Sequence, residues 1–212
     1  MDIVWYGHSC FRVTERGYAS VVSDPFDTSL GYEVPKLKAD IVTISHHAPG
    51  HDNLTAVKGY GHVIDGPGEY EIGEVFIMGV ATYDQTAPSP RRNVVYVLDY
   101  DSLTVAHLGD LDHVPNQSMI DALGPIDIAL VPVGGGTALS SSQAAEVISL
   151  LEPSVVVPMH FRTEALSKLD LDPVDRFLKE MGINAIQELG ILRATAGALP
   201  EQTQVVLLDY RH

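Results

Sequence analysis

The chain has 212 residues, 45% of them hydrophobic, and is therefore long enough to bury a substantial core. Its 28 acidic residues outnumber the 13 lysines and arginines, and the formal net charge of −15 argues against nucleic acid or an anionic membrane as a partner. The single cysteine, Cys10, cannot form an internal disulfide, and no leader-like or membrane-spanning run is evident, so we expect a cytoplasmic protein.

The N-terminal part of the chain is predicted to form an antiparallel meander. Residues 2–6, 10–14 and 18–23 are short β-type runs, and Gly7 and Gly17 separate them. A proline follows the third run closely and ends that strand, because proline has no N–H to donate to a β-ladder. Polar residues at such strand ends are frequent functional positions.

The apolar run at 41–44 is predicted to be a buried strand, and three histidines follow it closely. The three are His46, His47 and His51. Histidines in a loop at the carboxyl end of a buried strand are how α/β proteins present metal ligands to a crevice. The alternative is a solvated loop that is rich in histidine by chance. HLGD at 107–110 and PMHF at 158–161 follow apolar runs in the same way and favour metal ligands.

Further along, strands give way to alternating strands and helices. We predict strands at 62–65, 74–82, 93–100 and 103–107, a turn at 66–70 and a short helix capped by Asp52 or Asn53 that ends near Lys58. From residue 115, predicted helices at 115–123, 141–151 and 173–181 alternate with strands at 126–131, 155–158 and 204–209. This order favours one α/β domain of two similar halves, which join near 93–102.

Taken together, these motifs resemble the metallo-β-lactamase superfamily, and within it the small L-ascorbate-6-phosphate-lactonase-like group of metal-dependent hydrolases. The similarity covers nearly the whole chain and rests on GHSCF at 7–11, SDPF at 23–26, TISHHAPGHDN at 43–53, GPGEYEIGEVFIMGVATY at 66–83, HLGDLDH at 107–113, PVGGGTALSSSQAAEVI at 132–148 and PMHF at 158–161. The resemblance implies an α/β (α+β) four-layer αββα sandwich over residues 1–212. It also implies a metal site in the cleft between the two mixed sheets.

The chain departs from the family's signature loop, His-x-His-x-Asp-His. Laid on this sequence, the loop begins at His46 and ends at His51, so the second histidine falls on Ala48 and the aspartate on Gly50. Neither of these side chains can bind a metal. A further family histidine falls on Asp84, which is still a possible ligand.

The resemblance implies that the remaining ligands divide between two metal positions. One position would keep His51, Asp110 and His160, which are three ligands with room for water, as in a catalytic zinc site. The other would keep His46, Asp84 and a share of Asp110, a set that suits manganese, iron or magnesium better. We therefore expect one or two divalent ions, zinc first, bound more weakly than in the full family site.

Two further residues are expected to act beside the metal. His8 resembles a cleft histidine of the family that contacts substrate or supports a ligand, and with Asp110 it is the predicted catalytic pair. The alternative for His8 is a buried histidine bonded to backbone. Asp24 is expected to orient a ligand histidine by accepting its second N–H, or else to be a turn aspartate that bonds nearby amides.

The remaining polar candidates lie next to the predicted ligands. His107 ends a predicted strand and is expected to support Asp110 rather than to bind metal. His47 and Asp52 lie one residue from the family positions and could replace the carboxylate lost at Gly50, although His47 could also face outward.

The sequence thus predicts a hydrolase of a small ester, lactone or phosphoester, with hydroxide on the metal as the nucleophile. The partner would be a small molecule, and an anionic one is allowed because a bound cation inverts the local field. The alternative is a metal-poor family member that acts as a binding or structural protein, because Ala48 and Gly50 remove two ligands.

Overall fold

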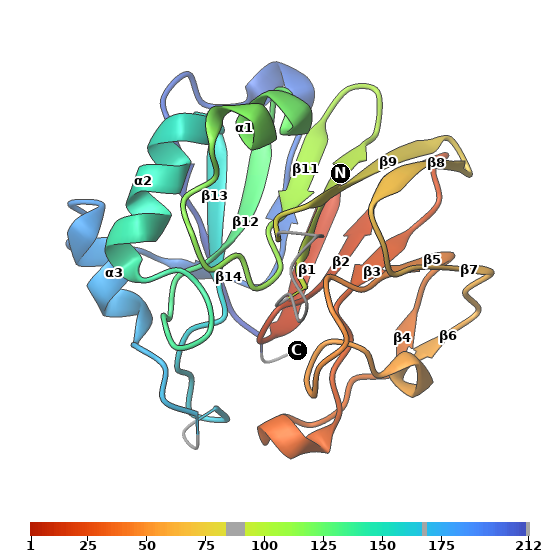
Figure 1. Ribbon diagram of the computed structural model, residues 1–212, viewed down its shortest axis with the longest axis horizontal. Helices are drawn as coiled ribbons and strands as arrows, with labels where there is room; N and C mark the ends of the chain where they lie inside the picture. The colour runs from red at the N-terminus through yellow and green to blue at the C-terminus, as the bar shows by residue number, and fades with distance from the viewer. Residues whose placement is uncertain (84–91, 167–168, 211–212) are drawn as a thin grey trace.

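Two mixed β-sheets form the centre of the protein (Figure 1), for which a computed structural model describes residues 1–83, 92–166 and 169–210. The first sheet has the order β15-β1-β2-β3-β5-β7. Its strands are β1 (Asp2–Gly7), β2 (Cys10–Thr14), β3 (Val21–Ser23), β5 (Ile41–Thr43), β7 (His62–Ile64) and β15 (Leu192–Arg193). The pairs β1–β2 and β2–β3 are antiparallel, which confirms the predicted meander, whereas β3, β5 and β7 run parallel.

The second sheet has the order β16-β13-β12-β11-β10-β9-β8. Its strands are β8 (Gly68–Ile72), β9 (Val75–Ala81), β10 (Val94–Asp99), β11 (Thr104–His107), β12 (Ile128–Pro132), β13 (Val155–Met159) and β16 (Gln204–Val205). The strands from β8 to β11 pair antiparallel, and those from β11 to β16 pair parallel. Every residue of β12 and β13 is buried, as expected for parallel strands covered on both faces.

Three α-helices lie along the outer side of the second sheet (Figure 1): α1 (Gln117–Leu123), α2 (Ser141–Leu151) and α3 (Val174–Glu180). The side chain of Ser140 accepts a hydrogen bond from the Gln143 amide, and the Gln143 side chain bonds back, so a capping box starts α2 at the predicted residue. The helix α1 starts two residues later than predicted, and Asn116 is its N-cap, accepting from the Met119 amide. No helix in the described part of the chain has both the length and the apolar character needed to cross a bilayer.

The outer face of the first sheet differs from the expected helical layer. In β3 and β5, Val21 and Ile41 face the second sheet, whereas Val22 and Val42 pack on the other side in a separate apolar cluster. Phe26, Tyr32, Leu37 and Val57 are among the residues that cover this side. They belong to the segment that contains the 3₁₀ turns η1 (Thr28–Leu30) and η2 (Leu54–Ala56) and the small ribbon of β4 (Leu37–Lys38) and β6 (Val57–Lys58). Among the described residues, α-helices occur only after Asn116.

Three local predictions were wrong. Of the turn predicted at 66–70, residues 68–70 belong instead to the edge strand β8, which pairs with β9. The predicted helix that ends near Lys58 is reduced to η2, where Oδ1 of Asn53 accepts from the Thr55 hydroxyl (2.7 Å) and caps no backbone N–H. The predicted strand at 204–209 splits into β16 and β17 (Leu207–Leu208), and β17 pairs with β14 (Glu188–Leu189) in a separate ribbon. A last 3₁₀ turn, η3, covers Ala196–Ala198.

The topology gathers several strand ends at one edge of the sandwich. The parallel strands β3 and β5 end at Ser23 and Thr43, and the parallel strands β11 and β13 end at His107 and Met159. Carboxyl ends of parallel strands meet at the same edge of a sheet, which is where α/β proteins place their sites. The chain crosses from the first sheet to the second between β7 and β8. A join between two similar halves near 93–102 stays a prediction.

Candidate metal centre

Four buried side chains converge at this edge: His8, His51, Asp110 and His160, each 2–4% exposed. The Oδ1 atom of Asp110 lies 3.2 Å from Nε2 of His160 and 3.6 Å from Nε2 of His51. The Nε2 atoms of His8 and His51 are 3.1 Å apart. One donor atom from each of the three histidines lies within 4.8 Å of the other two.

Asp24 fixes which nitrogen of His51 faces the cluster. Its Oδ2 accepts hydrogen bonds from Nδ1 of His51 (2.9 Å) and from the Ser45 hydroxyl (2.6 Å), and its Oδ1 accepts from the Ser45 amide (2.7 Å). Burial by itself raises the pKa of Asp24, but the hydrogen bond and charge of His51, together with the nearby His107 and His46, outweigh burial and lower that pKa, so Asp24 is ionised. With its proton on Nδ1, His51 presents a lone pair at Nε2.

His46 is held in the same tautomer by Ser45. The Ser45 hydroxyl gives its proton to Asp24, so the 3.0 Å contact to His46 requires that Nδ1 of His46 donate to it. Nε2 of His46 therefore carries a lone pair, and it lies 3.8 Å from Oδ2 of Asp110. The side chain of His46 is 11% exposed.

Asp110 is held by a residue that the sequence analysis missed. The Asp110 amide donates to Oδ1 of Asn93 (2.8 Å), while Nδ2 of Asn93 donates to the Leu108 carbonyl (3.1 Å). Thr137 donates its hydroxyl to Oδ2 of Asp110 (3.2 Å). Burial raises the pKa of the Asp110 carboxyl, but the neighbouring His51 and His160 outweigh it and hold that pKa well below its usual range.

Strained backbone positions His8 and His160. Both residues have the left-handed φ values, 51° and 52°, that non-glycine residues rarely adopt. The His8 carbonyl accepts from the His160 amide (3.1 Å) and from the Trp5 indole (3.0 Å), which ties the β1–β2 turn to the end of β13. Left-handed backbone costs roughly 1–2 kcal/mol per residue, so the surrounding packing must hold both turns in place.

The donor set fits a divalent ion. Ligands around a four-coordinate zinc with bonds of roughly 2.0–2.2 Å stand about 3.3 Å apart, and the contacts here are 3.1, 3.2 and 3.6 Å. Burial, together with the nearby His160 and His51, holds the pKa of His8 well below its usual range, so its imidazole is neutral. An ionised carboxylate and a neutral imidazole are the protonation states that metal binding requires.

A second group, Asp24, His46 and His51, also brings donor atoms within 4.8 Å of one another. Both Asp24 oxygens are already occupied by Ser45 and His51, so this group is a hydrogen-bond network rather than an ion site. The predicted orienting contact from Asp24 to a candidate ligand histidine is therefore present.

Two of the predicted supporting residues, His47 and Asp52, bond each other rather than the cluster. Nδ1 of His47 bonds Asp52 (3.2 Å) and its Nε2 bonds Asp65 (3.3 Å), and the His47 side chain is 59% exposed. The pair His47 and Asp52 therefore does not take the place of the carboxylate missing at Gly50. Asp52 instead adds to the negative field that, with Asp110 and Asp24, outweighs burial and raises the pKa of His51.

His107 is buried, but its ring supports backbone rather than a ligand side chain. Its Nε2 bonds the Ser9 carbonyl (2.8 Å) and its Nδ1 accepts from the Gly109 amide (3.3 Å), so neither nitrogen is available to a metal. It thus holds the turn that carries Asp110. The remaining predicted ligand, Asp84, lies outside the described residues.

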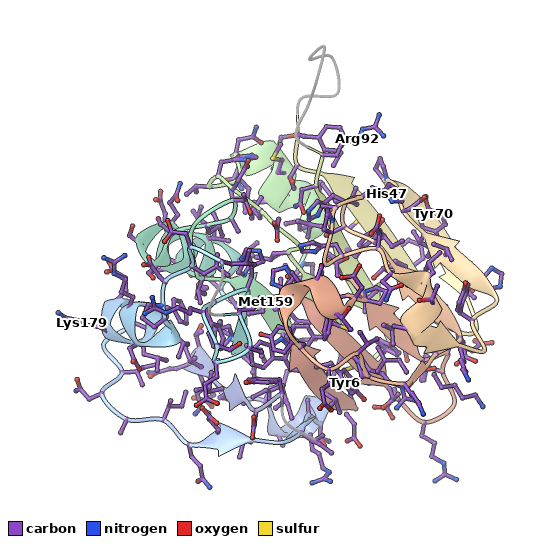
Figure 2. All side chains as sticks on the ribbon, turned by 90° about the horizontal axis from the view of Figure 1, so that it is seen from below. Tyr6, His47, Tyr70, Arg92, Met159 and Lys179 are labelled. Atoms are coloured by element: carbon purple, nitrogen blue, oxygen red, sulfur yellow. The ribbon has the colours of Figure 1, made fainter. Side chains whose placement is uncertain are left out.

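An open cavity of about 1070 Å³ leads to the cluster. His8, His51, Asp110 and His160 line its floor, with Gly136 and Thr137 beside them. Gly134 lies so close to Phe161 that an added Cβ would be 2.8 Å from the Phe161 Cα, which explains the glycine there. Arg92 and His47 also line the cavity, and they lie on the same side of the molecule in Figure 2.

The chain is similar to several known proteins. The family model of the β-lactamase superfamily domain matches residues 2–160. A UPF0173 protein of Pyrococcus abyssi is 30% identical over 191 residues, which cover 77% of this chain and 84% of the relative. A protein of Thermococcus onnurineus, named a UPF0173 metal-dependent hydrolase, is 28% identical. That match covers 77% of this chain and 85% of the Thermococcus protein.

Among solved structures, a Thermotoga maritima protein of the metallo-β-lactamase superfamily, provisionally named a Zn-dependent hydrolase, is 37% identical with a TM-score of 0.81. The match covers 98% of this chain and 97% of that one. The nearer resemblance to ascorbate-6-phosphate lactonases stays a prediction. From its sequence and its fold, this chain belongs to the metallo-β-lactamase superfamily and, within it, to the UPF0173 proteins.

Proposed function

We propose that this protein is a hydrolase whose divalent ion, zinc first, is held by His51, Asp110 and His160. One observation carries the proposal: Oδ1 of Asp110 lies within 3.6 Å of Nε2 of both histidines, at the floor of an open cavity. The names of relatives from Thermococcus onnurineus and Thermotoga maritima give the same activity to those proteins. Two imidazoles and a carboxylate make a ligand set that zinc accepts well.

The side chains around this site have separate roles in the proposal. Asp24 orients His51, while Asn93 and Thr137 orient Asp110 through its amide and its second oxygen. A divalent ion held by these residues would lower the pKa of a bound water to about 7, and so would supply a nucleophile at neutral pH. His46, with its Nε2 3.8 Å from Asp110, is the described part of a second, weaker ion position that Asp84 would complete.

The cavity supports a small substrate. A volume of about 1070 Å³ is at the upper end of the range for small-molecule sites. Arg92 at its wall is exposed and cationic, so a carboxylate or phosphate on the substrate would meet an opposite charge. We therefore propose an ester, lactone or phosphoester of a small, anionic molecule.

The test is hydrolysis by protein that has been stripped with a chelator and reloaded with zinc, manganese or iron. The panel contains an aryl ester, a γ-lactone, a sugar phosphate and a phosphodiester. We expect at least one substrate class to be turned over by the reloaded protein and by a Lys179→Ala control, but not by the stripped protein. The loss of Asp110 in Asp110→Asn should abolish that turnover.

Turnover that is equal in stripped and reloaded protein would contradict the proposal. So would a complete absence of turnover across the panel in protein that binds no metal. The second result would favour the alternative of a binding or structural protein, for which the changes at Ala48 and Gly50 are the motivating observation.

A further inference from the structure

Gly50 offers no side chain to an ion, and its backbone disfavours one. Gly50 has a φ of +97°, a backbone conformation that residues with a side chain rarely adopt. An added Cβ would lie 2.9 Å from the Leu30 side chain. Leu30, from η1, thus fills the space in which a side chain at residue 50 would begin. A donor that replaces the missing carboxylate must therefore come from another part of the chain.

His8 is a side chain from another part of the chain that reaches the candidate ligands. Its Nε2 is 3.1 Å from Nε2 of His51, and its ring lies 4.4 Å from the ring of His160, measured between centroids. It is 2% exposed and lines the floor of the cavity. The β1–β2 turn holds it there, with Trp5 bonded to its carbonyl.

The proton positions decide what the 3.1 Å contact between His8 and His51 means. Because Nδ1 of His51 donates to Asp24, Nε2 of His51 is the acceptor nitrogen of the neutral ring, which is the form that a metal needs. Without an ion, Nε2–H of His8 donates to Nε2 of His51. With an ion on His51, that hydrogen bond is impossible, and the proton of His8 belongs on Nδ1. Nδ1 of His8 has no hydrogen-bond partner among the described residues, so no fixed contact opposes this tautomer.

We propose that His8 is a fourth protein donor to the ion, which replaces the carboxylate lost at Gly50. This inference rests on the proposed metal site of His51, Asp110 and His160. The ion would then have four protein ligands: three histidine nitrogens and one oxygen of Asp110. A fifth coordination position would stay open to water from the cavity, as in zinc sites that become five-coordinate. His8 then acts by holding the ion rather than by contacting substrate alone.

The test measures zinc affinity by competition with a chromogenic chelator for the parent protein, His8→Asn, His160→Asn and a control, His113→Asn. Asparagine tolerates the left-handed backbone of His8 and His160, so these variants keep their turns, and His113 is an exposed histidine bonded to Asp112. The loss of a partner behind a ligand already weakens metal affinity about 10–100-fold, so the loss of His8 as a ligand should exceed about 100-fold. Circular dichroism melts of the metal-free variants verify folding.

A second readout separates direct binding from support. Imidazole ¹⁵N spectra, assigned from the peak that His8→Asn removes, should show Nε2 of His8 shifting on addition of zinc, together with His51. An unchanged His8 signal, or a His8→Asn affinity equal to that of the parent while His160→Asn loses zinc, would overturn this inference alone. A parent protein that binds no zinc would instead overturn the proposed function and this inference with it.

Discussion

At the scale of single residues, the site depends on where protons are fixed. Asp24 has a depressed pKa, is completely buried and accepts three hydrogen bonds, so it remains a carboxylate that selects one tautomer of His51. The Ser45 hydroxyl, which donates to Asp24, accepts from Nδ1 of His46 and so fixes the same tautomer there. A hydrogen-bond chain behind the ligands thus sets the direction of their lone pairs before any ion binds.

Replacing Asp24 tests this chain. In Asp24→Asn one of the two oxygens becomes an NH₂ group, which cannot accept from the His51 ring or the Ser45 hydroxyl. We expect zinc affinity to fall about 10–100-fold, as for other partners behind metal ligands. Chelator competition measures it, with Asp175→Asn on the exposed side of α3 as a matched control. An unchanged affinity would show that Asp24 is only a turn aspartate.

Sequence analysis identified these residues from their type and position in the chain. His51, Asp110 and His160 each follow an apolar strand, and the strand ends meet because the strands run parallel. The proximity of His8 to His51 could not be read in the same way, since the two residues are 43 positions apart in the chain and follow different strands, β1 and β5, of the first sheet. The space filled by Leu30 and the support from Asn93 likewise depend on packing that no local pattern records.

At the scale of elements, polar contacts between the sheets fix the edge that carries the site. The hydroxyl of Tyr96, on β10, donates to the carbonyls of Ile44 (3.1 Å) and Ile64 (3.2 Å) at the ends of β5 and β7. The Val94 amide donates to Ser45 (2.9 Å), next to His46. The histidine loop of the first sheet is thus joined directly to the second sheet.

We expect Tyr96→Phe to lower the free energy of unfolding by about 1 kcal/mol, since it removes a buried hydroxyl and leaves carbonyl acceptors underused. Urea titration measures the effect. The control is Tyr60→Phe at a half-buried tyrosine of the other apolar cluster. A loss no larger than that of the control would mean that the hydroxyl contributes nothing to the contact between sheets.

The pairing of β3 with β5 has a pH-dependent contact. Oδ2 of Asp40 accepts from the amide (2.8 Å) and hydroxyl (2.7 Å) of Ser20, and these bonds lower the pKa of Asp40. A lowered folded pKa stabilises above the unfolded value of about 3.9, and this stabilisation is lost as the pH falls through the folded pKa. Asp40→Asn should therefore be less stable than the parent at pH 7, with the difference shrinking below about pH 4. Melts of metal-free protein from pH 3 to pH 7 measure it, and a difference that is constant with pH would contradict the assignment.

The element scale also shows where sequence patterns failed. Helices over the second sheet have clear periodicity and capping residues, and α2 matched its predicted bounds. The outer layer of the first sheet is made of 3₁₀ turns and two-residue strands, which are too short to give a period. The edge strand β8 was hidden because Gly66 and Pro67 before it dominate the turn signal.

At the scale of the whole molecule, an ion at this site would join the two sheets. His51 lies in the loop after β5 of the first sheet, whereas Asp110 and His160 follow β11 and β13 of the second. A ligand that binds only the folded chain stabilises it, by about 2.7 kcal/mol at a free concentration 100 times its Kd. Chelation should therefore lower the Tm of the parent but not that of Asp110→Asn. An equal drop in both would mean that chelation acts elsewhere.

The central claim is that His51, Asp110 and His160 hold a metal ion, and metal content per chain tests it most directly. Untagged parent protein, Asp110→Ala, His160→Ala and the control His113→Ala are each exposed to zinc, desalted and analysed by elemental mass spectrometry. We predict about one zinc ion per chain in the parent and the control, and almost none in the two ligand variants. Zinc absent from the parent under every loading condition, or retained equally by Asp110→Ala and His160→Ala, would contradict the account.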